Sequence, residues 1–218
     1  VVYRGEHGAS TNDQPMSKIG NFTFVDDEDV AEVYANEPND RTQFAESPHV
    51  FAAYLSIQNP VIHNEMDPFA EFSQIEDNFG RDAAIKFAIK HGDWVVDTGN
   101  WQENYGDEYD DVESLLRAKP EEVRNLYMNA YVLLDDQEFT SAAKAAGFDG
   151  GIHMGNGESA VATEYRVFSP TQIKSASENN GNFDGADADI RRSTRTTVGE
   201  SDRAYTPEGT LVSRREAG

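Results

Sequence analysis

Glu164 is the residue of this chain whose type and position best suit it to chemistry. It begins an aromatic and β-branched segment, residues 164–168, which a Ser-Pro turn separates from a second short strand before residue 176. A carboxylate that is held on rigid strand backbone, and not on a loop, gives a site a fixed negative charge. The alternative is that Glu164 is a solvated residue at a strand edge, as most glutamates are exposed.

Two N-terminal segments carry further residues that could act in a site with Glu164. Residues 1–6 form an apolar strand that ends in an Arg-Gly pair with Arg4 as its cation. Residues 20–25 form a second short strand that contains Thr23, and an acidic start then opens a helix of about ten residues that carries Tyr34. These segments therefore offer a cation, a hydroxyl group and an aromatic face to the same site.

Together, the three segments resemble the NAD-binding core of the ADP-ribosyltransferase superfamily. Arg4 resembles the arginine of the Arg-Ser-Glu subclass, and Thr23 lies on the strand that supplies the middle residue of that triad. Tyr34 is similar to the tyrosine that stacks on nicotinamide, and Glu164 to the catalytic glutamate. The resemblance is closest to the transferase domains of phage polyvalent proteins, which have segments similar to residues 53–60, 147–152, 172–176 and 180–184.

The resemblance implies that NAD is a substrate and that Glu164 acts on it. Cleavage of the nicotinamide–ribose bond passes through an oxocarbenium-like state, so Glu164 would stabilise the positive charge on the ribose. Thr23 would hold Glu164 or the ribose by a hydrogen bond, and Arg4 would pair with the pyrophosphate or the adenosine ribose. The expected catalytic residues are Glu164, Arg4 and Thr23, and the expected NAD-binding residues are Tyr3, Arg4, Gly5, Phe24 and Tyr34.

Each of these residues also has a purely structural interpretation. Tyr34 lies on an apolar helix face, where a tyrosine usually belongs to the core. Thr23 is a good strand former, and a slip of one residue in the register would turn it to the other face of the sheet. Arg4 by itself would be an ordinary surface arginine.

Composition restricts the partners. The 218 residues include 40 acidic and 18 basic side chains, for a net charge of −22. Such a charge repels a phosphate backbone and favours a protein acceptor over a nucleic acid, although it also serves solubility alone. The chain has no cysteine, so disulfides and thiolate metal sites are excluded, and its five histidines lack metal-ligand spacing. No apolar run approaches the roughly 20 residues of a membrane span. The resemblance to domains of phage polyvalent proteins implies a soluble protein of the bacterial cytoplasm.

Strands at both ends of the chain with helices between them predict an α+β fold. The resemblance specifies it as two packed, mainly antiparallel sheets around an NAD cleft, with flanking helices. We expect a catalytic domain at residues 1–178, with a helical insertion at 61–135, and a polar, flexible tail or linker at 179–218. Because residue 1 already lies on a strand, we expect a domain cut from a longer polypeptide or a processed product. In the insertion we expect a helix that opens at residues 67–68, a short strand at 94–96 and a surface loop at 97–111.

The resemblance thus implies a mono-ADP-ribosyltransferase that modifies a host macromolecule, as a phage or bacterial effector or toxin. Two alternatives are an NAD glycohydrolase of the same fold, and a degenerate domain that serves as a virion or interaction module. Relatives that modify arginine carry a second glutamate two positions before the catalytic one. Here that position is Ala162, which cannot accept a proton, so we expect arginine to be a poor acceptor.

Overall fold

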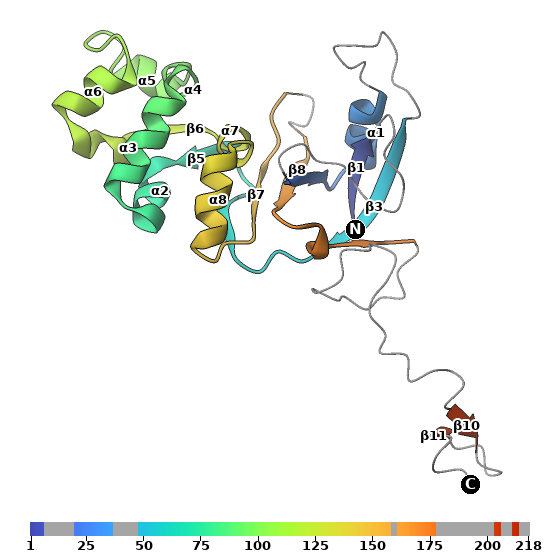
Figure 1. The fold of residues 1–218 in the computed structure, drawn as a ribbon. Coiled ribbons are helices and arrows are strands. Elements are labelled where there is room, and N and C mark those ends of the chain that lie inside the picture. The colour runs from blue at the N-terminus through green and yellow to red at the C-terminus, as the bar shows by residue number, and fades with distance from the viewer. Residues whose placement is uncertain (7–19, 37–47, 158–160, 178–202, 206–210, 214–218) are drawn as a thin grey trace.

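The computed structural model describes residues 1–6, 20–36, 48–157 and 161–177, and the backbone of 203–205 and 211–213. Seven strands form one sheet in the order β4-β7-β8-β2-β1-β3-β9 (Figure 1). Neighbouring strands are antiparallel except for the parallel pair β4 and β7. The strands are β1 (Val2–Glu6), β2 (Phe22–Val25), β3 (His49–Leu55), β4 (Pro60–Asn64), β7 (Gly150–Met154), β8 (Thr163–Val167) and β9 (Ile173–Ser175).

The sheet consists of two halves that are joined at β1 and β2. The register of these two strands is one pair, Tyr3 opposite Val25, whereas β1 and β3 are paired over five residues. A shared apolar cluster joins the two halves: Phe22, Phe24 and Val167 from one, and Phe51, Ala53 and Ile173 from the other. The two halves therefore pack on each other, and the predicted α+β class is confirmed.

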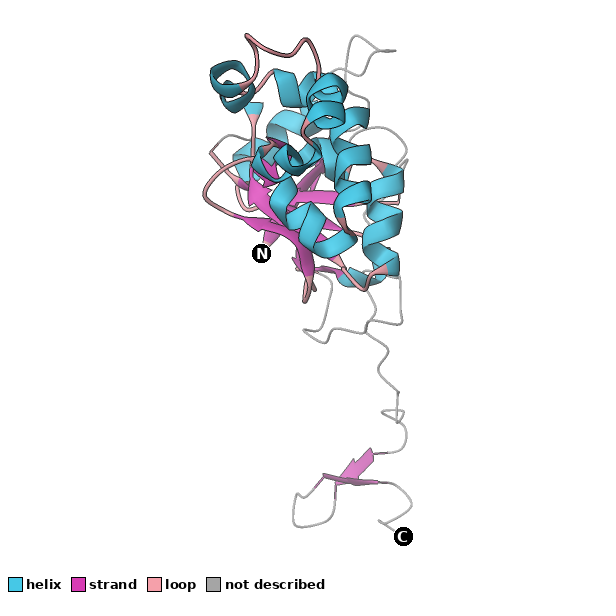
Figure 2. Cartoon of the chain, turned by 90° about the vertical axis from the view of Figure 1, so that its left-hand side faces the viewer, coloured by secondary structure: helices cyan, strands magenta, loops and turns pink. Residues whose placement is uncertain are grey.

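The chain between β4 and β7 forms a helical lobe with its own apolar core. Figure 1 shows helices α2 to α6 gathered at one end of the molecule, and Figure 2 shows the helices in front of the strands. A small antiparallel sheet of β5 (Phe69–Glu71) and β6 (Tyr127–Asn129) also belongs to this segment. The core cluster includes Phe72, Ile75, Leu115, Leu133 and Phe139, all fully buried. The helices are α2 (Phe72–Phe79), α3 (Arg81–Lys90), α4 (Gly92–Val96), α5 (Gly99–Asn104), α6 (Val112–Ala118), the 3₁₀ helix η1 (Pro120–Asn125), α7 (Ala130–Leu134) and α8 (Gln137–Ala145).

Three local expectations for the lobe are wrong. Residues 67–68 do not open a helix, because Asp67 accepts a hydrogen bond from the backbone N–H of Phe69 in a turn and β5 follows before α2 begins. Residues 94–96 belong to helix α4 and not to a strand, since a short apolar run suits either element. Residues 97–111 contain helix α5, which Thr98 caps and which buries Trp101 in the lobe core.

Helix α1 (Glu28–Asn36) packs directly on β1. It begins where the Asp27 carboxylate accepts hydrogen bonds from the backbone N–H groups of Asp29 and Val30, as expected of an acidic helix start. A Cβ atom at Gly5 would lie 2.0 Å from the Ala31 carbonyl oxygen, so only a glycine allows this approach. The 3₁₀ turn η3 (Pro170–Gln172) similarly sets the path into β9, because the Gln172 side chain accepts from two backbone N–H groups.

The expected tail at residues 179–218 falls largely outside the described residues. Within it, β10 (Arg203–Tyr205) and β11 (Leu211–Ser213) pair antiparallel. In the part of the chain that the structure describes, none of the helices has the length and apolar character needed to cross a membrane.

We expect Gly5→Ala to lower the free energy of unfolding by at least about 3 kcal/mol, because the new methyl group would force α1 away from β1. Urea denaturation measures this change. Gly99→Ala is the matched control: Gly99 lies in the first turn of α5 and a Cβ there meets no atom within 4 Å. A Gly5→Ala variant as stable as the control would contradict the close packing of α1.

Candidate active site

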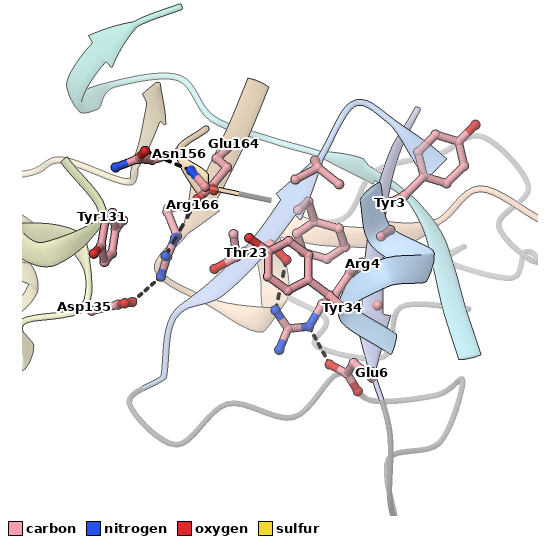
Figure 3. A pocket seen from close by; sticks show the side chains of 15 residues that line it. Tyr3, Arg4, Glu6, Thr23, Tyr34, Tyr131, Asp135, Asn156, Glu164 and Arg166 are labelled. Atoms are coloured by element: carbon pink, nitrogen blue, oxygen red, sulfur yellow. Dashed lines mark hydrogen bonds and ion pairs between the residues drawn. The ribbon is translucent and has the colours of Figure 1, made fainter. Parts of the chain in front are cut away.

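A cavity of about 650 Å³ opens beside the junction of the two sheet halves (Figure 3). Its volume is in the range of small-molecule and cofactor sites. One wall consists of β1 and α1, the other of β8, the end of α7 and the turn after β7, with β2 between them. The lining residues are Tyr3, Arg4, Gly5, Glu6, Thr23, Phe24, Val25, Ala31, Tyr34, Tyr131, Asp135, Asn156, Gly157, Glu164 and Arg166.

Arg4 is held across the gap between β1 and β2. Its Nη1 atom donates to the Thr23 carbonyl oxygen at 2.9 Å, and its Nε atom donates to the Glu6 carboxylate. The Glu6 side chain is only 5% exposed, so the ion pair is largely shielded from water. These contacts fix the plane of the guanidinium group at the cavity wall.

The aromatic residues of this wall differ in how deeply their side chains are buried. Tyr3 and Tyr34 are half-buried and pack against an apolar cluster that includes Val25 and Ala31. Phe24 is only 1% exposed and belongs to the cluster between the sheet halves. Phe24 therefore backs the cavity, whereas the two tyrosines lie at its surface.

Glu164 belongs to the opposite wall. Strand β8 is placed between β7 and β2, and Glu164 is 7% exposed, so it is not a solvated residue at a strand edge. It pairs with Val25 on β2 and with His153 on β7. Thr23 pairs with Arg166, so Thr23 is a diagonal neighbour of Glu164 on the same face.

Charged partners surround the Glu164 carboxylate. Its Oε2 atom lies 3.6 Å from Nε2 of His153 and 3.9 Å from Nη2 of Arg166. Arg166 in turn forms an ion pair with Asp135, which follows α7. Burial, together with the Asp135 and Glu164 carboxylates, raises the pKa of Tyr131, so this phenol keeps its proton at neutral pH.

His153 is the most buried charged or titratable neighbour of Glu164. It is 1% exposed, and its Nδ1 atom contacts the Met154 carbonyl oxygen at 2.8 Å. Burial lowers the pKa of the His153 imidazole, against the opposing effect of the Glu164 carboxylate. The ring is therefore neutral at pH 7.

The structure brings all the residues that the sequence singled out to one cavity: Tyr3, Arg4, Gly5, Thr23, Phe24, Tyr34 and Glu164 all line it. At Gly5, the backbone of helix α1 occupies the space that a side chain would need. Sequence reasoning missed Glu6, Tyr131, Asp135, Asn156, His153 and Arg166. Strand alternation could have found Arg166, two residues after Glu164, but the others depend on which segments become neighbours.

Among the described residues, no group of three or more histidine, aspartate or glutamate side chains is arranged to hold a metal ion.

Comparison with known proteins identifies the family of this chain. The family model described as ADP-ribosyltransferase in polyvalent proteins matches residues 1–183. The chain therefore belongs to the ADP-ribosyltransferases, in the family that occurs in polyvalent proteins. Searches of the curated proteins and of the solved structures returned no significant match.

Proposed function

We propose that this chain is a mono-ADP-ribosyltransferase that cleaves NAD and transfers ADP-ribose to a macromolecule, with Glu164 as the catalytic carboxylate. The observation that carries the proposal is one cavity with Arg4 and Tyr34 on one wall and Glu164 on the other. Membership in a family of polyvalent proteins further supports action on a protein of a bacterial host, in the cytoplasm, after delivery by a phage.

Glu164 would act by stabilising positive charge. When the bond between the ribose C1′ and the nicotinamide nitrogen breaks, the bonding electrons leave with nicotinamide, which becomes neutral, and positive charge develops on the ribose. A fixed carboxylate beside the ribose lowers the energy of that state because its charge is already oriented. The acceptor then bonds to C1′ and loses a proton, which Glu164 could take.

The wall formed by β1 and α1 would bind NAD. Arg4 is held by Glu6 and by the Thr23 carbonyl group, so its planar fork is oriented in advance for the diphosphate or the adenosine ribose. Tyr34 would stack on the cationic nicotinamide ring, and Tyr3 would add a second aromatic surface. Phe24 would support this wall from behind, and Thr23 would orient the ribose near Glu164.

The catalytic role of Glu164 predicts the effect of Glu164→Gln. The change keeps the shape of the side chain and removes its charge, so nicotinamide release should fall about 100-fold or more. Chromatography of the released nicotinamide measures the rate, and circular dichroism checks the fold. Glu103→Gln, at an exposed position of α5, is the control and should retain the wild-type rate. A Glu164→Gln variant with half of the wild-type rate would show that the carboxylate is not catalytic.

Stacking by Tyr34 predicts that the ring matters and its hydroxyl group does not. Tyr34→Leu keeps apolar contact with the neighbouring cluster but should weaken NAD binding roughly tenfold, since a cation–aromatic contact contributes about 0.5–2 kcal/mol. Tyr34→Phe should bind NAD as the wild type does. Isothermal titration with NAD compares the two variants, and equal affinities would assign Tyr34 to packing alone.

The acceptor should not be arginine. The position two residues before Glu164 is occupied by Ala162, which is 4% exposed and packs in the apolar cluster beneath α1. A methyl group cannot orient a guanidinium group or accept its proton. We expect free arginine and agmatine to be poor acceptors of labelled ADP-ribose, and the protein product to resist the hydroxylamine treatment that removes ADP-ribose from acidic side chains.

Mass spectrometry of a host lysate treated with the enzyme and NAD identifies the modified residues. Modification mainly on arginine would contradict this expectation. Nicotinamide release with no labelled macromolecule would instead favour an NAD glycohydrolase, in which water is the acceptor.

A further inference from the structure

We propose that His153 is a positioning residue that acts through Glu164: its Nε2 atom controls how much of the carboxylate's charge is available to the substrate. The proposal rests on the catalytic role of Glu164 proposed above. It assigns a function to a buried histidine that does not itself line the cavity.

The sheet register places His153 directly against Glu164. The two residues face each other on β7 and β8, so their side chains leave the sheet on the same side. The Nε2 atom lies 3.6 Å from Oε2 of Glu164, and both side chains are more than nine-tenths buried. Water therefore screens this contact weakly.

A backbone contact selects the tautomer of the ring. The Nδ1 atom lies 2.8 Å from the Met154 carbonyl oxygen, and a carbonyl oxygen can only accept a hydrogen bond. The proton of the neutral imidazole is therefore on Nδ1, and Nε2 presents a lone pair to Glu164. Within the described residues, Nε2 is a buried atom with no hydrogen-bond partner.

The other charges near His153 come from β8 and from the end of α7. The Nη2 atom of Arg166 lies 3.9 Å from the same Oε2 atom of Glu164, and Arg166 also forms an ion pair with Asp135. Arg166 disfavours the protonated form of His153, whereas Glu164 and Asp135 favour it. Arg166 is always protonated and so is a constant partner of Glu164. His153 is the neighbour that can change its charge.

Two states of the site follow. With a neutral ring, Nε2 is an acceptor and gives no hydrogen bond to Glu164, so the negative charge of the carboxylate remains directed to the ribose. With a protonated ring, Nε2–H donates to Oε2 and neutralises much of that charge. The usual pKa of histidine is 6.5, and burial lowers that of His153, so the second state forms only in acid. NAD cleavage should therefore fall as the pH falls through the pKa of His153.

Two substitutions separate these states. In His153→Gln, the amide nitrogen can reach the position of Nε2 and donate to Glu164 at every pH. In His153→Phe, a ring of similar shape offers neither a donor nor a titrating group. Nicotinamide release is measured between about pH 5 and pH 8, the range in which histidine titrates. His63→Gln, at a half-exposed histidine outside the cavity, is the control and should keep the wild-type pH profile.

We expect both variants to lose the fall in rate that the wild type shows in acid. The Gln variant should be slower than the Phe variant by about 10- to 100-fold, as expected when a hydrogen bond to a charged group is made permanent. The proposal would be overturned if either folded variant kept the wild-type fall in nicotinamide release at low pH. Equal rates of nicotinamide release in the two variants would also overturn it.

A second measurement does not depend on activity. NMR titration of the histidine ring signals, with His153 assigned by its loss in His153→Gln, gives the pKa of His153 in the wild type and in Glu164→Gln. The pKa should fall in Glu164→Gln, because the carboxylate that favours the imidazolium is gone. An unchanged pKa would show that the two side chains are not coupled. If NAD is not cleaved at all, the proposed function fails, while this titration still decides whether His153 and Glu164 are coupled.

Discussion

Arg4 spans the place where the two halves of the sheet separate, and the cavity depends on that contact. Strands β1 and β2 share the pair Tyr3 and Val25, and beyond it the guanidinium group bonds to the Thr23 carbonyl oxygen. Backbone carbonyl groups need hydrogen-bond donors, and the Arg4 side chain is a donor to that of Thr23. The same side chain therefore completes the sheet junction and provides the positive charge of the cavity wall. A lysine could not make both contacts with one planar group.

The charges of the cavity are arranged in pairs despite the strongly acidic composition. Arg4 is paired with Glu6 on one wall, and Arg166 with Asp135 on the other. Glu164 lies between Arg166 and a neutral His153, so it has one permanent cation nearby and one neighbour that can become a cation. Arg166 is therefore the permanent counter-charge of the buried Glu164 carboxylate. The two walls also belong to different cores, since Tyr131 packs on the helical lobe whereas Tyr3 and Tyr34 pack on α1 and the sheet.

The sequence predicted the features that depend on near neighbours and missed those that depend on distant pairing. The acidic start of α1 follows from a local rule, because a helix cap needs only nearby residues. The short apolar run at residues 94–96 suits a strand or a helix, and packing in the lobe selects the helix. Arg4, Thr23 and Glu164 were grouped through a family resemblance. His153 and Asp135 required knowledge that β7 lies beside β8 and that α7 reaches the cavity.

The strand order also determines when the cavity can exist during synthesis. Its wall of β1 and α1 comes from the first 36 residues, whereas Glu164 and Arg166 are made after the whole helical lobe. Strand β2 pairs with β8 across more than a hundred intervening residues, for example Phe22 with Val167. Contacts of such separation form late, since the long loop must close first. Until β8 has been synthesised, the nascent chain has an incomplete cavity. The helical lobe can fold before that point because its contacts are local.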